Sequence, residues 1–337
     1  MVAGQHGEDT LSRRTQTAAS GALVHSKQIR LALVGMVTEN DHPYSWSAIF
    51  NGYDPGEMKK KADPIISDYL GKQPKAAFGI PGARVTHIWT DRRSDAISVA
   101  KASRIPNIVA RPEDVIGKVD AVLIPTDRGD EHVSRCRPFV KAGLPVFVDK
   151  PLVDNEADLR TFSKWVASGV PIMSCSFMRY CKEFIPYRAS TCELGKIRFA
   201  SITTPKSWER YGIHALEGIY AILGPGFLSV QNTGTFERNL VHLQHRSGAD
   251  VVVVATADMY GSPLVLQLCG TAGHVTVSMV DRFYAFKQQL TGFISYLRTG
   301  VRPFPFSETQ ELMRLVIAGI KSRNEGGRKI MLSDLGC

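Results

Sequence analysis

The sequence has no run of about 18 consecutive apolar residues, the length that a membrane-spanning helix needs. Near the N-terminus, residues 18–24 are too few and too small to form the apolar core of a secretory signal. The 337 residues are 44% hydrophobic and 22% charged, which is typical of a globular protein, and the length favours two domains. We therefore expect a soluble, cytoplasmic protein that does not contact membranes.

Cysteine is scarce, and its positions show none of the short paired spacings that indicate a metal site or a disulfide framework. The six positions are Cys136, Cys175, Cys181, Cys192, Cys269 and Cys337. Several of them lie in apolar stretches, which is typical of reduced thiols in the cytoplasm. We therefore expect no metal site and no disulfide.

Acidic residues are outnumbered by basic ones, which gives a formal net charge of +9. Basic residues gather at 59–61, 92–93 and 321–329, but no aromatic residues are interleaved with them and no recognition helix accompanies them. We therefore expect no nucleic-acid partner. A mildly cationic surface does favour anionic ligands such as a dinucleotide.

Strand patterns alternate with helix patterns in the first half of the chain. Short apolar, β-branched runs predict the strands, and amphipathic stretches such as 131–142 predict the helices between them. The predicted strands include 29–35, 85–91, 119–126 and 146–149, and residues 45–50 predict the start of a helix that Ser45 caps. This alternation predicts an α/β fold whose N-terminal domain, residues 29–177, is a Rossmann-type doubly wound parallel sheet.

Two segments of this half do not follow the alternation. Residues 1–28 are rich in small and polar residues without periodicity, which predicts a disordered N-terminal extension. Residues 52–83 form an unusually long stretch punctuated by proline and glycine, so we expect an insert that acts as a flap or as a packing element.

The loop after the first predicted strand is poor in glycine. A dinucleotide-binding turn commonly uses three glycines, for tightness, for approach to the pyrophosphate and for helix packing. Gly35 is present, but Val37 and Asn40 take the other two positions, and Glu39 and Asp41 add carboxylates close to the expected phosphate. The predicted cofactor contacts in this loop are Gly35, Met36 and Val37.

The second predicted strand ends at an acidic residue, Asp91, which Arg92 and Arg93 follow. In a dinucleotide-binding fold an acid at this position accepts the ribose hydroxyls of NAD, whereas arginines accept the 2′-phosphate of NADP. Because the acid occupies the strand end itself, we predict NAD, with NADP as the alternative and with Asp91 and Arg92 in contact with the cofactor. A plain helix cap is the structural alternative for Asp91.

Polar residues follow two neighbouring predicted strands. Thr126 ends one strand, and Asp149, Lys150 and Pro151 end the next. Because the carboxyl ends of parallel strands meet at one rim, we expect these residues to face one crevice. Pro151 fixes the backbone and holds Lys150 at the sheet edge. A functional lysine and a solvated lysine in a turn are both open at this point.

After residue 177 the pattern changes to strands without helices between them. The predicted strands are 196–202, 250–256, 264–269 and 274–279, with a hairpin turn at 270–273 and helices at 211–223 and 307–322. Residues 178–337 are therefore predicted to form a C-terminal α+β domain with a large, mostly antiparallel sheet. Such an open sheet tends to associate, so we expect a homodimer or homotetramer.

Several short motifs in this order resemble those of the Gfo/Idh/MocA family, which includes glucose-fructose oxidoreductase and the inositol dehydrogenases. The family's Glu-Lys-Pro motif resembles residues 149–151, and its Thr-Pro...His turn resembles residues 126–132 with one residue extra. Its Asn-x-Arg-Phe, Leu-Gly-x-Ile and Gly-x-His-x-x-Asp segments resemble 178–180, 194–197 and 212–217. The resemblance covers nearly all of the chain from residue 28 to 335.

The resemblance implies an NAD(P)-dependent oxidoreductase that moves a hydride between nicotinamide and the hydroxyl or ketone carbon of a sugar, cyclitol or related polyol. It implies that His214 transfers the proton and Lys150 polarises the reacting oxygen, or the reverse, and alcohol oxidation needs both functions. The implied substrate contacts are Arg179, Tyr180, Trp208, Arg210 and Glu217. The implied cofactor contacts are Thr126, His132, Asp149 and Lys150.

The chain departs from the family pattern in two places. Arg210 stands where the family commonly has an aspartate four residues before the histidine, and the loop after Gly35 lacks two glycines. Two alternatives to a dehydrogenase are therefore open. One is a binding or regulatory protein that has lost catalysis or its cofactor, and the other is a lyase or hydrolase that holds NAD tightly.

Overall fold

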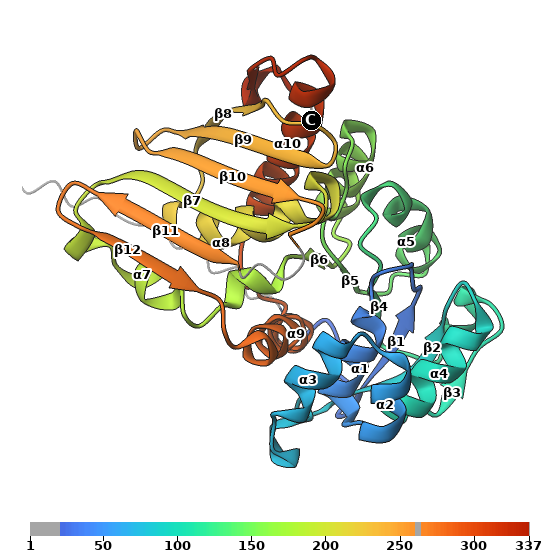
Figure 1. The fold of residues 1–337 in the computed structure, drawn as a ribbon. Coiled ribbons are helices and arrows are strands. Elements are labelled where there is room, and N and C mark those ends of the chain that lie inside the picture. Colours follow the sequence, from blue (N-terminus) through green and yellow to red (C-terminus); the bar gives the residue numbers. More distant parts are fainter. Residues whose placement is uncertain (1–20, 260–263, 337) are drawn as a thin grey trace, which may run out of the picture.

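The computed structural model describes residues 21–259 and 264–336 (Figure 1). The predicted disordered extension falls outside the described residues up to residue 20. Its remainder differs from the prediction, because Val24 is buried and the backbone N–H groups of Leu23 and Val24 donate to the carbonyl of Leu297 at 2.9 and 3.0 Å. The packed part of the chain therefore begins before residue 28.

The first sheet has six parallel strands in the order β3-β2-β1-β4-β5-β6. Its strands are β1 (Ile29–Val34), β2 (Ala83–Trp89), β3 (Asn107–Ile108), β4 (Ala121–Ile124), β5 (Val146–Val148) and β6 (Ile172–Ser174). The order reverses between β1 and β4, the position at which doubly wound sheets bind their ligands. The predicted Rossmann-type sheet is confirmed.

Four helices connect these strands: α1 (His42–Asn51), α4 (Arg93–Ser103), α5 (His132–Lys141) and α6 (Glu156–Ala167). Helix α1 begins three residues before the predicted start at Ser45, because the carbonyl of Asp41 accepts from the N–H groups of Tyr44 and Ser45. The Ser45 hydroxyl is not a cap, and it pairs with the hydroxyl of Tyr69 instead. This earlier start places His42 in the first turn of the helix.

The long segment from 52 to 83 folds into helices α2 (Pro55–Lys61) and α3 (Pro64–Gly71) and a short 3-10 turn, Lys75–Ala77. The side chains of Asp54 and Asp63 cap the two helices by accepting from Glu57 N and Ile65 N. Helix α3 packs on helix α9 (Arg282–Thr299) of the second half of the chain. The segment thus forms one wall of the junction between the two sheets.

The second sheet has seven strands in the order β12-β11-β7-β10-β9-β8-β13. They are β7 (Ile197–Pro205), β8 (Phe227–Asn232), β9 (Arg238–His245), β10 (Asp250–Thr256), β11 (Val265–Gly270), β12 (His274–Ser278) and β13 (Ile330–Met331). All pairings are antiparallel except that of β7 with β10. The predicted mostly antiparallel sheet is confirmed, and β8, β9 and β13 add to the predicted strands.

Helices α8 (Ile213–Leu223) and α10 (Phe306–Asn324) cover one face of this sheet (Figure 1). Helix α9 was not predicted, and it joins the two halves, since Phe293 packs on Phe147 of β5 with ring centroids 5.4 Å apart. Within the described ranges, no helix is both long and apolar enough to cross a membrane. Association through the sheet stays a prediction.

Candidate active site

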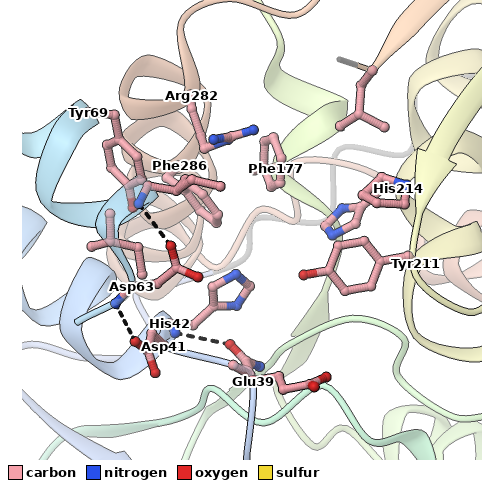
Figure 2. A pocket seen from close by; sticks show the side chains of 15 residues that line it. Glu39, Asp41, His42, Asp63, Tyr69, Phe177, Tyr211, His214, Arg282 and Phe286 are labelled. Atoms are coloured by element: carbon pink, nitrogen blue, oxygen red, sulfur yellow. Dashed lines mark hydrogen bonds between the residues drawn. The ribbon is translucent and has the colours of Figure 1, made fainter. Parts of the chain in front are cut away.

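A pocket of about 170 Å³ lies where the rim of the parallel sheet meets helices α3, α8 and α9 (Figure 2). His42, Tyr211 and His214 point into it from different elements. Its other lining residues are Glu39, Asn40, Asp41, Asp63, Ile65, Ile66, Tyr69, Phe177, Pro205, Leu264, Arg282 and Phe286. The predicted proton-transfer residue His214 is therefore at a cavity, and His42 joins it there without having been predicted.

Lys150 is buried at the end of β5, with 1% of its surface exposed, so it is not a solvated lysine in a turn. Its ammonium lies 3.7 Å from a carboxylate oxygen of Asp127 and 4.6 Å from the centre of the Tyr211 ring. No hydrogen-bond partner of Nζ lies among the described residues. Lys150 is not among the residues that line the pocket, but Tyr211, whose ring its ammonium contacts, is one of them.

Asp127 connects Lys150 to Arg210, whose guanidinium donates to both carboxylate oxygens at 2.9 and 3.1 Å. Burial alone would raise the pKa of Asp127, but the charges of Lys150 and Arg210 outweigh it and lower this pKa. Asp127 is therefore a buried anion with two cationic partners. Arg210, predicted to contact substrate, binds Asp127 and the loop after β1 and does not line the pocket.

His214 is buried on α8 between the rings of Phe177 and Tyr211, whose centroids are 5.0 and 4.9 Å away. Burial, together with the charge of Lys150, holds the pKa of His214 well below its ordinary value. Its Nδ1 lies 2.6 Å from the hydroxyl oxygen of Ser176. The imidazole is therefore neutral at neutral pH.

This depressed pKa predicts a pH dependence of stability. Below the ordinary histidine pKa of about 6.5, the unfolded chain binds a proton that folded His214 does not, so the free energy of unfolding falls as the pH decreases. The decrease is up to about 1.4 kcal/mol per pH unit for this group, until the pH reaches the folded pKa. Urea unfolding between about pH 5 and 8 measures this effect. The free energy of unfolding should change less with pH in His214→Gln than in the wild type.

The matched control for this measurement is His242→Gln, because His242 is partly exposed beside Asp250 on the second sheet. In this variant the free energy of unfolding should change with pH as it does in the wild type. A His214→Gln variant with an unchanged slope would show that His214 does not carry this dependence.

The other four predicted substrate contacts, like Arg210, do not line the pocket. Glu217 accepts from the backbone N–H of Ser176 at 3.1 Å and from Arg179 at 2.5 Å, and Arg179 also binds Glu308 at 2.6 Å. Trp208 is fully buried and donates to the carbonyl of Val316. Tyr180 lines a separate surface hollow beside α7 (Ile185–Ala189). Glu217 thereby holds Ser176, whose hydroxyl contacts His214.

Two predicted cofactor contacts hold the end of β4 in place. Buried His132 has its Nε2 2.9 Å from the carbonyl of Thr126 and its Nδ1 3.0 Å from the carbonyl of Leu152. Gly35 has φ +103°, and a Cβ there would lie 2.9 Å from the Thr126 methyl carbon. The positive φ and this close approach explain why a glycine stands at this position.

A groove runs beside the pocket, and we call it the arginine groove. It is lined by Met36, Val37, Thr38, Glu39, Asp91, Arg92, Arg128, Arg135 and Arg210. Apart from Arg210, which precedes α8, its residues come from the loop after β1, the end of β2 and the segment after β4, as a dinucleotide site requires. Glu39 lines both the groove and the pocket, so the two are contiguous.

The groove contains the predicted Asp91 and Arg92 and adds Arg128 and Arg135, which the sequence analysis missed. Asp91 accepts from the backbone N–H of Met36 at 3.2 Å and from Arg135 at 2.9 Å. Asp91 is thus not a helix cap. Guanidinium groups can bind phosphate oxygens in place of the N–H groups of a glycine-rich turn, so these residues fit a dinucleotide.

Comparisons with known proteins agree with this geometry. Residues 66–169 match the model of the "Oxidoreductase family, NAD-binding Rossmann fold", GFO_IDH_MocA. No curated protein matched the sequence. The description of this model names NAD, which agrees with the predicted cofactor.

Three of the similar solved structures show how far the likeness extends. A probable dehydrogenase from Thermotoga maritima has 17% identity and a TM-score of 0.71, covering 91% of this chain and 100% of that one. Scyllo-inositol dehydrogenase from Lactobacillus casei, with bound NAD(H) and scyllo-inositol, has 13% identity, a TM-score of 0.71 and coverages of 91% and 100%. A myo-inositol dehydrogenase from Corynebacterium glutamicum has 18% identity, a TM-score of 0.68 and coverages of 90% and 99%. The resemblance to the Gfo/Idh/MocA oxidoreductases is therefore confirmed, in sequence over residues 66–169 and in fold over about nine tenths of the chain.

Proposed function

We propose that this protein is an NAD-dependent dehydrogenase that interconverts a secondary hydroxyl and a ketone on a neutral polyol, cyclitol or sugar. The observation that carries the proposal is the position of Lys150. Its buried ammonium has no hydrogen-bond partner among the described residues. It lies 3.7 Å from Asp127, which binds Arg210 of the arginine groove, and 4.6 Å from the centre of the ring of Tyr211, which lines the pocket. Such a charge stabilises a developing alkoxide far better than a solvated one does.

The groove residues would hold the dinucleotide. Asp91 would accept ribose hydroxyls, and Arg128, Arg135 and Arg210 would face the diphosphate. Bound NAD would supply the hydride acceptor beside the pocket, and the side chains of the chain would bind the polyol and move its proton. His214 would contact the reacting hydroxyl from α8.

The charge of the pocket lining supports a neutral substrate. Three carboxylates line the pocket, those of Glu39, Asp41 and Asp63, whereas Arg282 is its lining guanidinium. A carboxylate or phosphate group on the substrate would be repelled by this lining. Polyols offer hydroxyls that donate to carboxylates and imidazoles, so an uncharged polyol suits the pocket better than a sugar acid.

A panel of inositols, aldoses and the corresponding sugar acids, followed by nicotinamide absorbance, tests the proposal. We expect NADH formation with neutral polyols, and at least about tenfold lower kcat/KM with the acid forms, the effect of about 1.4 kcal/mol of repulsion. Turnover of a polyol without net NADH, in protein purified with bound NAD, would support the lyase or hydrolase alternative instead. The absence of any reaction together with tight polyol binding would support the binding-protein alternative, which the changed loop at Val37 and Asn40 favours.

Replacing Asp91 with alanine tests the nucleotide preference. The change removes acceptors for the ribose hydroxyls of NAD and frees Arg135, which Asp91 binds at 2.9 Å, to meet a 2′-phosphate. We expect NADH affinity to fall at least about tenfold, the scale of a hydrogen bond to a charged group, and NADPH affinity to rise. Fluorescence titration with both nucleotides measures this. Equal, unchanged affinities would remove Asp91 from the cofactor site.

A further inference from the structure

His42, which lines the pocket, pairs with the buried carboxylate of Asp149. Nδ1 of His42, in the first turn of α1, lies 2.5 Å from Oδ2 of Asp149, which follows β5. Asn40 fixes the same carboxylate, because its amide donates to Asp149 Oδ2 at 3.4 Å and to the carbonyl of Pro125 at 2.9 Å. Asp149 is 1% exposed, and its second oxygen, Oδ1, has no hydrogen-bond partner among the described residues.

Aromatic rings hold the imidazole of His42 in one orientation. It stacks on Trp46 at 5.4 Å between centroids and meets the edge of Phe286 at 5.2 Å. The side chain is 16% exposed and lines the pocket, where it lies opposite the hydroxyl of Tyr211 (Figure 2). The ring is therefore fixed with one edge on Asp149 and the other edge toward the cavity.

The partner of Nδ1 determines which nitrogen of His42 carries the proton. A carboxylate oxygen accepts only, so Nδ1 is the donor and Nε2 keeps its lone pair. Within the described ranges of the chain, no hydrogen bond occupies Nε2 of His42. The pocket thus contains a basic nitrogen that a buried carboxylate orients.

His214 has the opposite arrangement. The hydroxyl oxygen of Ser176 accepts from the backbone N–H of Met178 at 3.1 Å, and among the described residues its own hydrogen has Nδ1 of His214, 2.6 Å away, as its acceptor. Neutral His214 then carries its proton on Nε2 and offers a donor to a substrate. This arrangement differs from the role predicted for His214 from sequence, that of the proton-transfer group.

We propose that His42, oriented by Asp149, accepts the proton of the substrate hydroxyl, and that His214 donates a hydrogen bond to the same oxygen. The assignment rests on the proposed dehydrogenase function. In the oxidation the C–H bond breaks with its electron pair going to NAD⁺, the O–H bond breaks with its proton going to Nε2 of His42, and a C=O bond forms. One alcohol and one NAD⁺ give one ketone and one NADH, and Asp149 stabilises the imidazolium.

The pair of His42 and Asp149 also supplies an orienting carboxylate that is absent at position 210. The family commonly has an aspartate four residues before His214, and this chain has Arg210 there, bound to Asp127. The carboxylate that orients an imidazole is present after all, but it is Asp149 and the imidazole is that of His42. The proton-accepting group has thus moved from α8 to the first turn of α1.

The test combines kinetics with the histidine protonation pattern. For His42→Ala we expect turnover to fall by about 10² to 10⁴, the range for loss of a general base, with NADH affinity within about twofold of the wild type. Added imidazole should restore part of the activity, which a purely structural role does not predict. Asp149→Asn should lower turnover as well. The matched control, His242→Gln, disrupts the surface pair of His242 and Asp250, 2.7 Å apart, and should change neither quantity.

Nitrogen NMR of histidine-labelled protein without cofactor gives a second readout that needs no substrate. We expect a protonated Nδ1 in His42 and a protonated Nε2 in His214. A protonated Nε2 in neutral His42 would overturn the inference. More than half of the wild-type turnover in His42→Ala would overturn it too. The dehydrogenase proposal would stand in both cases. A wild type that oxidises no polyol in the panel contradicts the proposed function, and the role of His42 then falls with it.

Discussion

Replacing Lys150 with methionine is expected to lower turnover about a hundredfold or more while the protein stays folded and binds NADH normally. The loss is the usual scale for removing a buried electrostatic group at a reacting oxygen. Methionine keeps most of the side-chain volume of a residue that is 1% exposed. Asp127 keeps its paired hydrogen bonds from Arg210, so no unpaired buried carboxylate is left behind.

Lys182→Met is a matched control, because Lys182 has the same two kinds of contact as Lys150. Its ammonium lies 2.5 Å from the carboxylate of Asp281 and 5.7 Å from the centre of the Tyr284 ring. It lies outside the pocket lining, so Lys182→Met should keep wild-type turnover. The double variant Lys150→Met with His214→Ala should be little worse than either single variant, because groups that act on one oxygen are not additive. Full activity of Lys150→Met would remove the lysine from the reaction.

Replacing Arg179 with methionine should destabilise the protein by about 3–5 kcal/mol, the cost of leaving a buried charge without its partner. Arg179 binds Glu217 and Glu308 at 2.5 and 2.6 Å, and its guanidinium lies 4.1 Å from the centre of the Phe304 ring. Burial already raises the pKa of Glu217, although Arg179 opposes this. Without the guanidinium, Glu217 would have to bind a proton or draw in water.

Urea unfolding measures this effect. Arg160→Met is the control, because the ion pair of Arg160 with Glu156 is exposed, and such pairs contribute at most about 1 kcal/mol. Adding Glu217→Gln to Arg179→Met should recover part of the lost stability. If Arg179→Met instead kept its stability and raised KM alone, Arg179 would be a substrate contact, as the family resemblance implies.

The alternation of strands and helices could be predicted from the sequence because its determinants are local. Buried β-branched runs such as 119–126 and glycine stops such as Gly143 mark the elements of a parallel sheet wherever they occur. The sequence also located Lys150 and Thr126 at one rim, since parallel strands end on the same side. The burial of Lys150 could not be predicted in this way, because it involves a contact with Tyr211, which is distant in sequence.

The site residues that the sequence analysis missed depend on tertiary contacts. His42 becomes a pocket residue because α1 begins at His42 and because β5 brings Asp149 beside it, across more than a hundred residues. Arg135 looks like a solvated helix residue until the fold places it against Asp91. The local pattern for α1 had a signal that could have found its start, since Asp41 followed by Pro43 is a common helix opening.

Calorimetric titration of the purified protein with NADH tests the central claim most directly, because the arginine groove must bind a dinucleotide although two loop glycines are absent. We predict saturable binding with one site per chain and a dissociation constant between about 1 µM and 1 mM, the range of typical KM values. NADPH should bind more weakly, since Asp91 repels a 2′-phosphate. No heat beyond dilution with either nucleotide at millimolar concentration would contradict the account.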